Sequence, residues 1–222
     1  MSPTVTFAIC VCNESRDLYS LVSFLNKVRE PGDDIVILVD SLHVSPQVRA
    51  VLDHFKESVT VHERDFDGNF SKHRNYHISK CKGDFIFVID PDEMPQEFLV
   101  KNIRRVFQDT KADIIAVPRM NMCPGHTEEW ARDRFTLNEV GWINWPDYQT
   151  RIFRNGIGLK FDNELHEMIK GSSKVVAVTA EPRHSLWHIK SVDKQDNRWV
   201  REVSGEYVMT HPDLKNLFDS IS

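Results

Sequence analysis

Strands and helices alternate along the first half of the sequence, and this alternation restricts the possible folds more than any other feature. Apolar runs of strand length occupy residues 5–12, 34–40, 58–63, 84–90 and 112–118. Between them, residues 15–27 and 45–55 carry apolar side chains at helical spacing, and residues 71–80 and 95–108 are also predicted to be helical, the former with Ser71 as its N-cap. Strands that are apolar on both faces and alternate with helices form a parallel sheet covered by those helices. The sequence therefore predicts an α/β fold with a mostly parallel sheet flanked by helices.

The second half of the sequence is less regular. Residues 119–147 are rich in Trp, Arg and Glu and predict a long functional loop with short elements. Strands are predicted at residues 149–154 and 174–179, and a helix from about residue 192. The chain therefore divides into one domain, residues 1–190, and a C-terminal helical extension, residues 191–222.

The composition is that of an ordinary globular protein. Hydrophobic residues make up 41% of the chain and charged residues 27%, and the formal net charge is −5, which counts against a domain built to coat nucleic acid. None of the four cysteines forms a CxxC pair. The sequence shows neither a basic signal-peptide start nor an apolar segment of the roughly 20 residues that cross a bilayer. We therefore expect reduced thiols and a cytoplasmic protein, free or attached peripherally to a membrane.

Polar side chains follow the ends of the predicted parallel strands. They are Asn13, Glu14, Asp40, Arg64, Asp65, Asp90 and Asp92. Ligands of such sheets bind at the carboxyl ends of the strands, so these side chains are expected to line one site.

Three carboxylates crowd the end of the strand at residues 84–90. Asp90, Asp92 and Glu93 lie within four positions, with Pro91 between the two aspartates. Like charges so close repel one another unless a cation lies among them. Carboxylates at positions i and i+2 can bind one hard divalent cation that keeps other positions open for water and phosphate. A solvated acidic turn is the alternative, but the position at the end of a buried strand favours a metal site.

Several longer segments carry a family resemblance. The chain resembles a family 2 glycosyltransferase of the GT-A fold, in the branch that includes lipopolysaccharide-core β-glucosyltransferases. The matching segments are FAICVCNES, ILVDS, DFDGNFSKHRNYHISKCKGDFIFVIDPDEMP, DYQTRIFR, LHEMIKG and SLWHIKSVDKQDNRW, and they cover about residues 4–200. The resemblance implies a Rossmann-like sheet with a nucleotide-sugar half, residues 1–118, and an irregular acceptor half, residues 119–190.

The same resemblance implies a metal and donor site. Asp90 and Asp92 would hold Mn²⁺ or Mg²⁺ against the diphosphate of a nucleotide-sugar, with His188, in preference to His184, completing the site. Asn13 and Glu14 would reach the nucleoside base, and Asp40 the ribose. For Glu14 the alternative is a favourable position near a helix N-terminus.

Arg74 suits bidentate contact with a phosphate or a carboxylate. The alternative is a structural ion pair with Asp65, Asp67 or Asp84, and the two roles are compatible.

Inverting glycosyl transfer needs a carboxylate that accepts the proton of the acceptor hydroxyl. The resemblance of the HE segment favours Glu167 as this base, with its neighbour Glu164 and with Asp147 as rivals. Gln149 and Arg151 are expected in the same cleft. The alternative for Glu167 is an ion pair with Arg151.

The leading hypothesis is a metal-dependent inverting glycosyltransferase that uses a nucleotide-sugar, a UDP-sugar being favoured. The acceptor could be a carbohydrate, a lipid-linked sugar or, in a phage-type enzyme, a modified base of DNA. Trp130, Trp142 and Trp145 could stack on acceptor sugars or form a small core under the loop. A nucleotidyltransferase ranks lower, because the segment CNESRD lacks the glycine of a triphosphate-binding loop. A non-catalytic nucleotide-binding scaffold is the third class.

Overall fold

The computed structural model describes residues 2–190, so the helical extension predicted for residues 191–222 lies outside the described residues. The helices are α1 (Ser15–Val28), α2 (Pro46–His54), α3 (Phe70–Ile78), α4 (Glu97–Thr110) and α5 (Glu128–Arg132), with a 3-10 turn, η1 (Pro182–His184). The strands are β1 (Val5–Val11), β2 (Asp34–Asp40), β3 (Thr60–Arg64), β4 (Phe85–Ile89), β5 (Glu93–Pro95), β6 (Ile114–Met122), β7 (Ile143–Arg154), β8 (Lys160–Asp162), β9 (Met168–Lys170), β10 (Val175–Ala177) and β11 (Leu186–Ile189).

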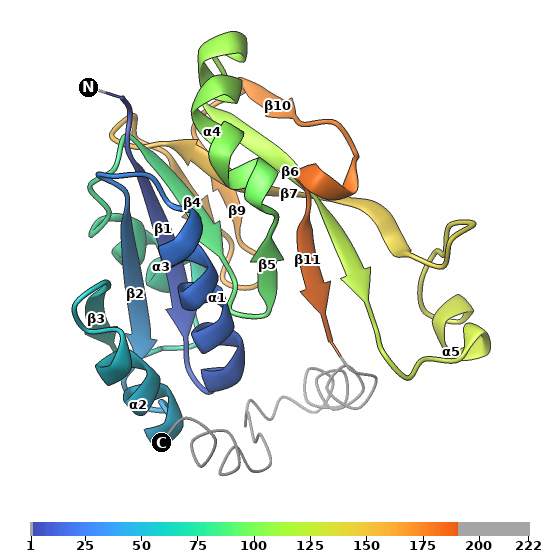
Figure 1. The fold of residues 1–222 in the computed structure, drawn as a ribbon, viewed down its shortest axis with the longest axis horizontal. Helices are drawn as coiled ribbons and strands as arrows, with labels where there is room; N and C mark the ends of the chain where they lie inside the picture. The colour runs from blue at the N-terminus through green and yellow to red at the C-terminus, as the bar shows by residue number, and fades with distance from the viewer. Residues whose placement is uncertain (1, 191–222) are drawn as a thin grey trace.

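One large sheet organises the described part of the chain (Figure 1). Its nine strands within residues 2–190 follow the order β3-β2-β1-β4-β7-β6-β11-β5, and β10 pairs with β6. Strands β3, β2, β1 and β4 are parallel, as the alternation of strands and helices predicts. Their carboxyl ends therefore meet at one edge of the sheet.

The two faces of the sheet are covered differently. Phe7 of β1 lies in an apolar core with Leu21 of α1 and Ile103 of α4. Ala8, on the opposite face of β1, lies in a second core with Phe161 of the β8-β9 hairpin. Because β1 is buried on both faces, it reads as a continuous apolar run in the sequence.

The second half of the domain departs most from the prediction. Strand β7 begins at Ile143, six residues before the predicted strand, and runs antiparallel between β4 and β6. Residues 119–147, predicted as a loop with short elements, supply the end of β6, α5 and the start of β7. Residue 118, the predicted boundary between the two halves, lies inside β6, so both halves share one sheet.

The predicted N-cap of the third helix is wrong. The α3 helix begins at Phe70 and Asn69 is its N-cap, with extended backbone and a side-chain oxygen that accepts a hydrogen bond from Lys72 N at 2.9 Å. The Ser71 hydroxyl donates to the same oxygen. Two good capping residues stand two positions apart, and the chain uses the first.

Residues 2–190 include every cysteine of the chain and all the helices that the structure describes. All four cysteines, Cys10, Cys12, Cys81 and Cys123, lie in this range and are free thiols. None of the helices described there has the length and apolar character needed to cross a membrane.

Gly83 approaches β1 so closely that no side chain fits there. A Cβ atom at Gly83 would lie 2.6 Å from the backbone nitrogen of Thr6 and 2.9 Å from its hydroxyl oxygen. We expect Gly83→Ala to lower the free energy of unfolding, measured by urea denaturation, by about 1–3 kcal/mol. The adjacent exposed substitution Lys82→Ala is the control and is expected to stay within about 0.5 kcal/mol. Equal losses in the two variants would contradict this close packing.

Candidate active site

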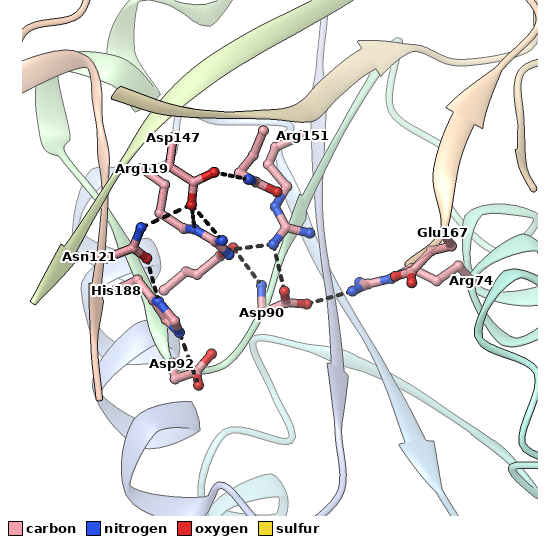
Figure 2. A network of polar contacts seen from close by, with 11 residues as sticks. Arg74, Asp90, Asp92, Arg119, Asn121, Asp147, Arg151, Glu167 and His188 are labelled. Carbon is pink, nitrogen blue, oxygen red and sulfur yellow. Dashed lines mark hydrogen bonds and ion pairs between the residues drawn. The ribbon is translucent and has the colours of Figure 1, made fainter. Parts of the chain in front are cut away.

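A network of charged and polar side chains fills the carboxyl edge of the sheet (Figure 2). It begins with the residues that follow β4. Both carboxylate oxygens of Asp90 are bound by arginines: Oδ1 accepts from Arg74 Nη2 and Oδ2 from Arg151 Nη2, each at 2.6 Å. Burial alone would raise the pKa of Asp90, but the guanidinium groups of Arg151 and Arg74 outweigh it and hold the pKa well below its usual range. Asp90 is therefore an ionised carboxylate clamped between two cations.

Arg74 stands at one end of the network, on α3. Its Nε donates to Glu167 Oε1 at 2.7 Å, so this arginine bridges Asp90 and Glu167. The next helical residue, Asn75, exchanges two hydrogen bonds of 2.8 Å with the backbone of Phe161 in β8. The Arg-Asn pair thus ties α3 to the β8-β9 hairpin and to the end of β4 at once. The ion pairs that the sequence offered for Arg74, with Asp65, Asp67 or Asp84, are not those that form.

Glu93 lies at the centre of the network, and its side chain is fully buried. Its Oε1 accepts from Arg151 Nη2 at 2.6 Å and from Arg119 Nη1 at 3.1 Å, while Oε2 accepts from the backbone N–H of Asp90. Glu93 therefore holds both arginines and the turn that carries the two aspartates.

Strand register explains how β6, β7 and β11 build the rest of the network. Asp147 and Gln149 are two apart on β7, so they share one face, and Arg151 follows where the register between β6 and β7 shifts. Arg119 of β6 stands opposite Asp147. Its Nε and Nη2 donate to Asp147 Oδ2 at 2.9 and 2.7 Å, while Gln149 Nε2 donates to Oδ1 at 2.8 Å. The structure thus brings the predicted residues Asp147, Gln149 and Arg151 together.

His188 reaches the same edge from β11. It stands opposite Asn121 of β6, and its Nδ1 lies 2.8 Å from Asn121 Oδ1. Its Nε2 lies 3.5 Å from Asp92 Oδ2, at the end of the network shown on the left of Figure 2. His184 lies elsewhere: its Nδ1 donates to Thr179 O and its ring packs on Phe98. Of the two histidines, His188 is the one beside an aspartate of the predicted pair.

The residues after β1 and β2 are already engaged with the backbone. Glu14 Oε2 accepts from the N–H groups of Cys12 and Asn13 at 3.0 and 2.9 Å, which fixes the turn between β1 and α1. Asp40 Oδ1 accepts from Leu42 N and Phe66 N, while Oδ2 contacts His43 Nδ1 at 2.7 Å. Both carboxylates order the loops at the carboxyl edge of the sheet.

Glu167 lies in the connection between β8 and β9, and 14% of its side chain is exposed. The connection turns sharply because Asn163 and His166 adopt left-handed backbone conformations. Its neighbour Glu164 is tied to the start of α3, since Asn69 Nδ2 donates to Glu164 Oε1 at 3.1 Å. The alternative that paired Glu167 with Arg151 is wrong, because Glu167 binds Arg74 and Arg151 binds Asp90 and Glu93.

A family model described as Glycosyl transferase family 2 matches residues 6–169. The chain belongs to that family. The family predicted from the sequence is confirmed, and this segment is a glycosyltransferase domain. No curated protein matched the sequence.

Solved structures of glycosyltransferases share the fold of this glycosyltransferase domain. The S. aureus TarS 1-349 structure in complex with UDP has a TM-score of 0.57 and 14% identity, over 87% of this chain and 62% of that chain. The TarS 1-349 structure in complex with UDP-GlcNAc has a TM-score of 0.56 and 14% identity, over 85% and 58%. The chain therefore spans less than two thirds of these structures. The predicted GT-A fold is confirmed.

A more distant match is the mannosyltransferase PcManGT of Pyrobaculum calidifontis, in complex with GDP-Man and Mn²⁺. Its TM-score is 0.47 and its identity 13%, over 54% of this chain and 36% of that chain. A likeness at that level says nothing about the ligands of the present domain.

The side chains at the site determine whether this family 2 domain can bind a divalent cation. Within residues 2–190, no group of three His, Cys, Asp or Glu side chains forms a metal site by itself. Asp92 and His188 form a pair of one carboxylate and one imidazole. Two protein ligands fit a cation that takes its remaining ligands from water and substrate phosphates. Asp90 fits less well as a ligand, because both of its oxygens bind arginines.

The sequence interpretation of the glycosyltransferase site missed Glu93, Arg119 and Asn121. The sequence did contain a signal for two of them. Arg119 and Asn121 are two apart and come directly after the apolar part of a strand, so they lie on the same face of that strand. Glu93 was visible as the third carboxylate after β4, but nothing in the sequence says that it faces arginines from β6 and β7.

The tryptophans of residues 119–147 form ring contacts of their own. Trp142 and Trp145 pack edge to face with ring centroids 5.0 Å apart, and Trp130 packs on Phe135. A hollow of about 340 Å³ adjoins the site at Asn121. It is lined by Asn121, Met122, Cys123, Pro124, Gly125, His126 and Gly141.

Proposed function

We propose that this domain transfers a sugar from a nucleotide-sugar to an acceptor hydroxyl, with a divalent cation and with inversion at the anomeric carbon. The observation that carries the proposal is the Asp92–His188 pair, which lies just after β4 at the carboxyl edge of the sheet. The pair places a carboxylate and an imidazole, both of which can bind a divalent cation, 3.5 Å apart. The free thiols and the sequence are in keeping with a cytoplasmic location, which is part of the proposal.

Asp92 and His188 would hold the cation, and Mn²⁺ fits this pair better than Mg²⁺, which prefers oxygen ligands alone. The bound cation supplies Lewis-acid stabilisation of the charge on the leaving diphosphate. Asp90, held by Arg74 and Arg151, fixes the turn that presents Asp92. The two arginines also keep positive charge beside the place where phosphate would bind.

The donor's nucleoside would lie over the loops that Glu14 and Asp40 order. Asn13 and Glu14 follow β1, and Asp40 is the last residue of β2, so all three lie at the sheet edge that binds ligands in α/β folds. The TarS structures in complex with UDP and UDP-GlcNAc make a UDP-sugar the first donor to test.

Glu167 is the proposed general base, and Asp147 is the weaker candidate. The carboxylate of Asp147 accepts four hydrogen bonds, from Arg119, Asn121 and Gln149. Burial would raise the pKa of Asp147, but Arg119 and the amide donors lower it below its usual range, which makes it a poor proton acceptor. Glu167 accepts from a single guanidinium nitrogen, Arg74 Nε.

The acceptor would enter from the β6-β7 side, where the hollow beside Asn121 and the pair Trp142–Trp145 lie. Indole faces suit the C–H faces of sugar rings, so a carbohydrate or lipid-linked sugar is the proposed acceptor class. A modified base of DNA is less favoured by the net charge of −5.

Calorimetric binding of UDP, GDP, CDP and dTDP, each with and without Mn²⁺, tests the proposal. We expect one nucleotide, UDP first, to bind tightly only with Mn²⁺. Asp92→Asn, which keeps the size of the side chain but removes its charge, is expected to weaken this binding by about 10–100-fold or more, as losses of metal ligation do.

Asp65→Asn is the matched control, because Asp65 also follows a strand at this edge but pairs with Ser41 rather than with His188. Nucleotide binding that is independent of Mn²⁺ and of Asp92 would contradict the metal site. Tight binding of Mn²⁺ and UDP without turnover of any UDP-sugar would point to a scaffold instead of an enzyme.

A further inference from the structure

A chain of three hydrogen-bonded side chains ends at the proposed metal site. It runs from Asp147 through Asn121 to His188, across the adjacent strands β7, β6 and β11 (Figure 2). We propose that Asp147 and Asn121 are positioning residues that fix His188 as the Nδ1–H tautomer and so direct its bare Nε2 toward Asp92. This inference rests on the proposed function only for the identity of the cation.

The orientation of the Asn121 amide follows from chemistry. Asn121 Nδ2 lies 2.9 Å from Asp147 Oδ2. Arg119 and the amide donors lower the pKa of Asp147 against the effect of burial, so this carboxylate is ionised and only accepts hydrogen bonds. The NH₂ group of Asn121 must therefore face Asp147, which leaves its carbonyl oxygen on the side of His188.

The tautomer of His188 follows from the orientation of the amide. Its Nδ1 lies 2.8 Å from Asn121 Oδ1, which can only accept, so Nδ1 carries a proton. In the neutral imidazole the other nitrogen, Nε2, then has a lone pair and lies 3.5 Å from Asp92 Oδ2. A lone pair and a carboxylate oxygen that face each other are both acceptors, and a cation between them satisfies both. Metal-binding histidines are commonly held this way through their second nitrogen.

An irregularity in the sheet makes the chain of contacts possible. The register between β6 and β7 shifts between Arg119 and Asn121: Arg119 stands opposite Asp147, but Asn121 stands opposite Ile143. The extra residues lie on β7, where Asn144 has a positive φ of 54°. Bulges of this kind re-aim side chains next to active sites. Here the shift lets Arg119 and Asn121 both bind Asp147.

The tautomer can be measured without metal or nucleotide. NMR spectra of the ring nitrogens of ¹⁵N-histidine-labelled protein are recorded at a pH well above the ordinary imidazole pKa of about 6.5. The signal that is missing in His188→Gln belongs to His188. We expect the Nδ1–H form in the wild type and its loss in Asn121→Leu, which keeps the size of the side chain but removes the amide. Gln149→Leu removes the other amide that donates to Asp147 and is expected to leave the His188 tautomer unchanged.

The affinity for Mn²⁺ in the presence of UDP is the second readout. Asn121→Leu is expected to lower it by about 10–100-fold. The exchange Asn121→Asp with Asp147→Asn keeps one carboxylate and one amide, and the new carboxylate can still accept from His188 Nδ1. This double variant is expected to recover most of the loss and the Nδ1–H form.

An Nε2–H tautomer in the wild type, or unchanged tautomer and Mn²⁺ affinity in Asn121→Leu, would overturn the inference. If the wild type shows the expected tautomer but binds no Mn²⁺, the proposed metal site is overturned. The assignment of the imidazole proton is supported in that case. The two failures are therefore distinguishable.

Discussion

Glu93→Ala is expected to lower the free energy of unfolding by about 3–5 kcal/mol, the usual cost of removing one partner from a buried ion pair. The Glu93 side chain is fully buried and binds Arg119 and Arg151 at 3.1 and 2.6 Å. Truncation would remove one carboxylate partner from each of the two guanidinium groups. It would also remove the acceptor of the Asp90 N–H. Arg151 is the more affected, since 11% of its side chain is exposed and water cannot replace the lost partner easily.

Urea denaturation of the metal-free protein measures this effect. Glu63→Ala is the control, because Glu63 pairs with Arg49 at the surface, where 42% and 46% of the two side chains are exposed. Surface pairs of this kind contribute about 0–1 kcal/mol. Glu93→Gln, which keeps the shape and some of the hydrogen bonds, is expected to fall between the two. A loss for Glu93→Ala no greater than that for Glu63→Ala would mean that the network does not stabilise the fold.

The parallel half of the sheet could be predicted because its signals are local. Each of β1, β2 and β4 is an apolar run buried on both faces, and the helices α1, α2 and α4 each carry an apolar stripe. The site carboxylates at the strand ends were predictable for the same reason, since chain order alone places them at one edge. The prediction of Asn13, Glu14, Asp40, Asp90 and Asp92 at one edge needed no tertiary information.

The second half could not be predicted because its pairings are distant in sequence. Strand β7 is inserted antiparallel between β4 and β6. The short strand β11 pairs with β6, and the short strand β5 pairs with β11. Three or four residues carry too little periodicity to show such elements. The end of β6 and the start of β7 are polar on the site face, so they look like a loop in the sequence.

The partners within the site were unpredictable for the same reason. Residue types showed that arginines and carboxylates would meet, but not which ones. Arg151 binds Asp90 and Glu93 because β7 lies beside β4, and Arg74 binds Glu167 because Asn75 anchors the β8-β9 hairpin to α3. The bases, metal ligands and donor contacts named from the sequence remain predictions that the experiments above address.

Glu167→Gln is expected to lower kcat about 10²–10⁴-fold, the usual contribution of a general base. Glutamine keeps the size of the side chain, and its carbonyl oxygen can still accept from Arg74 Nε, which binds Glu167 at 2.7 Å. The substitution therefore removes the ability to take a proton with little change in geometry. The measurement is the release of UDP from the UDP-sugar that binds, with water or a sugar as acceptor. Binding of UDP with Mn²⁺ is expected to stay unchanged, since Glu167 does not contact Asp92 or His188.

Glu164→Gln is the matched control, because Glu164 lies in the same connection between β8 and β9 but is exposed and bonded to Asn69. It is expected to keep nearly the full kcat. A large loss of kcat in Glu164→Gln, with Glu167→Gln unaffected, would transfer the role of base to Glu164. A loss in Glu167→Gln matched by an equal loss of thermal stability would show that the ion pair with Arg74 is structural. A loss of kcat in a variant that stays folded and binds UDP with Mn²⁺ as tightly as the wild type is the result expected for a residue that acts in the chemical step, as a base does.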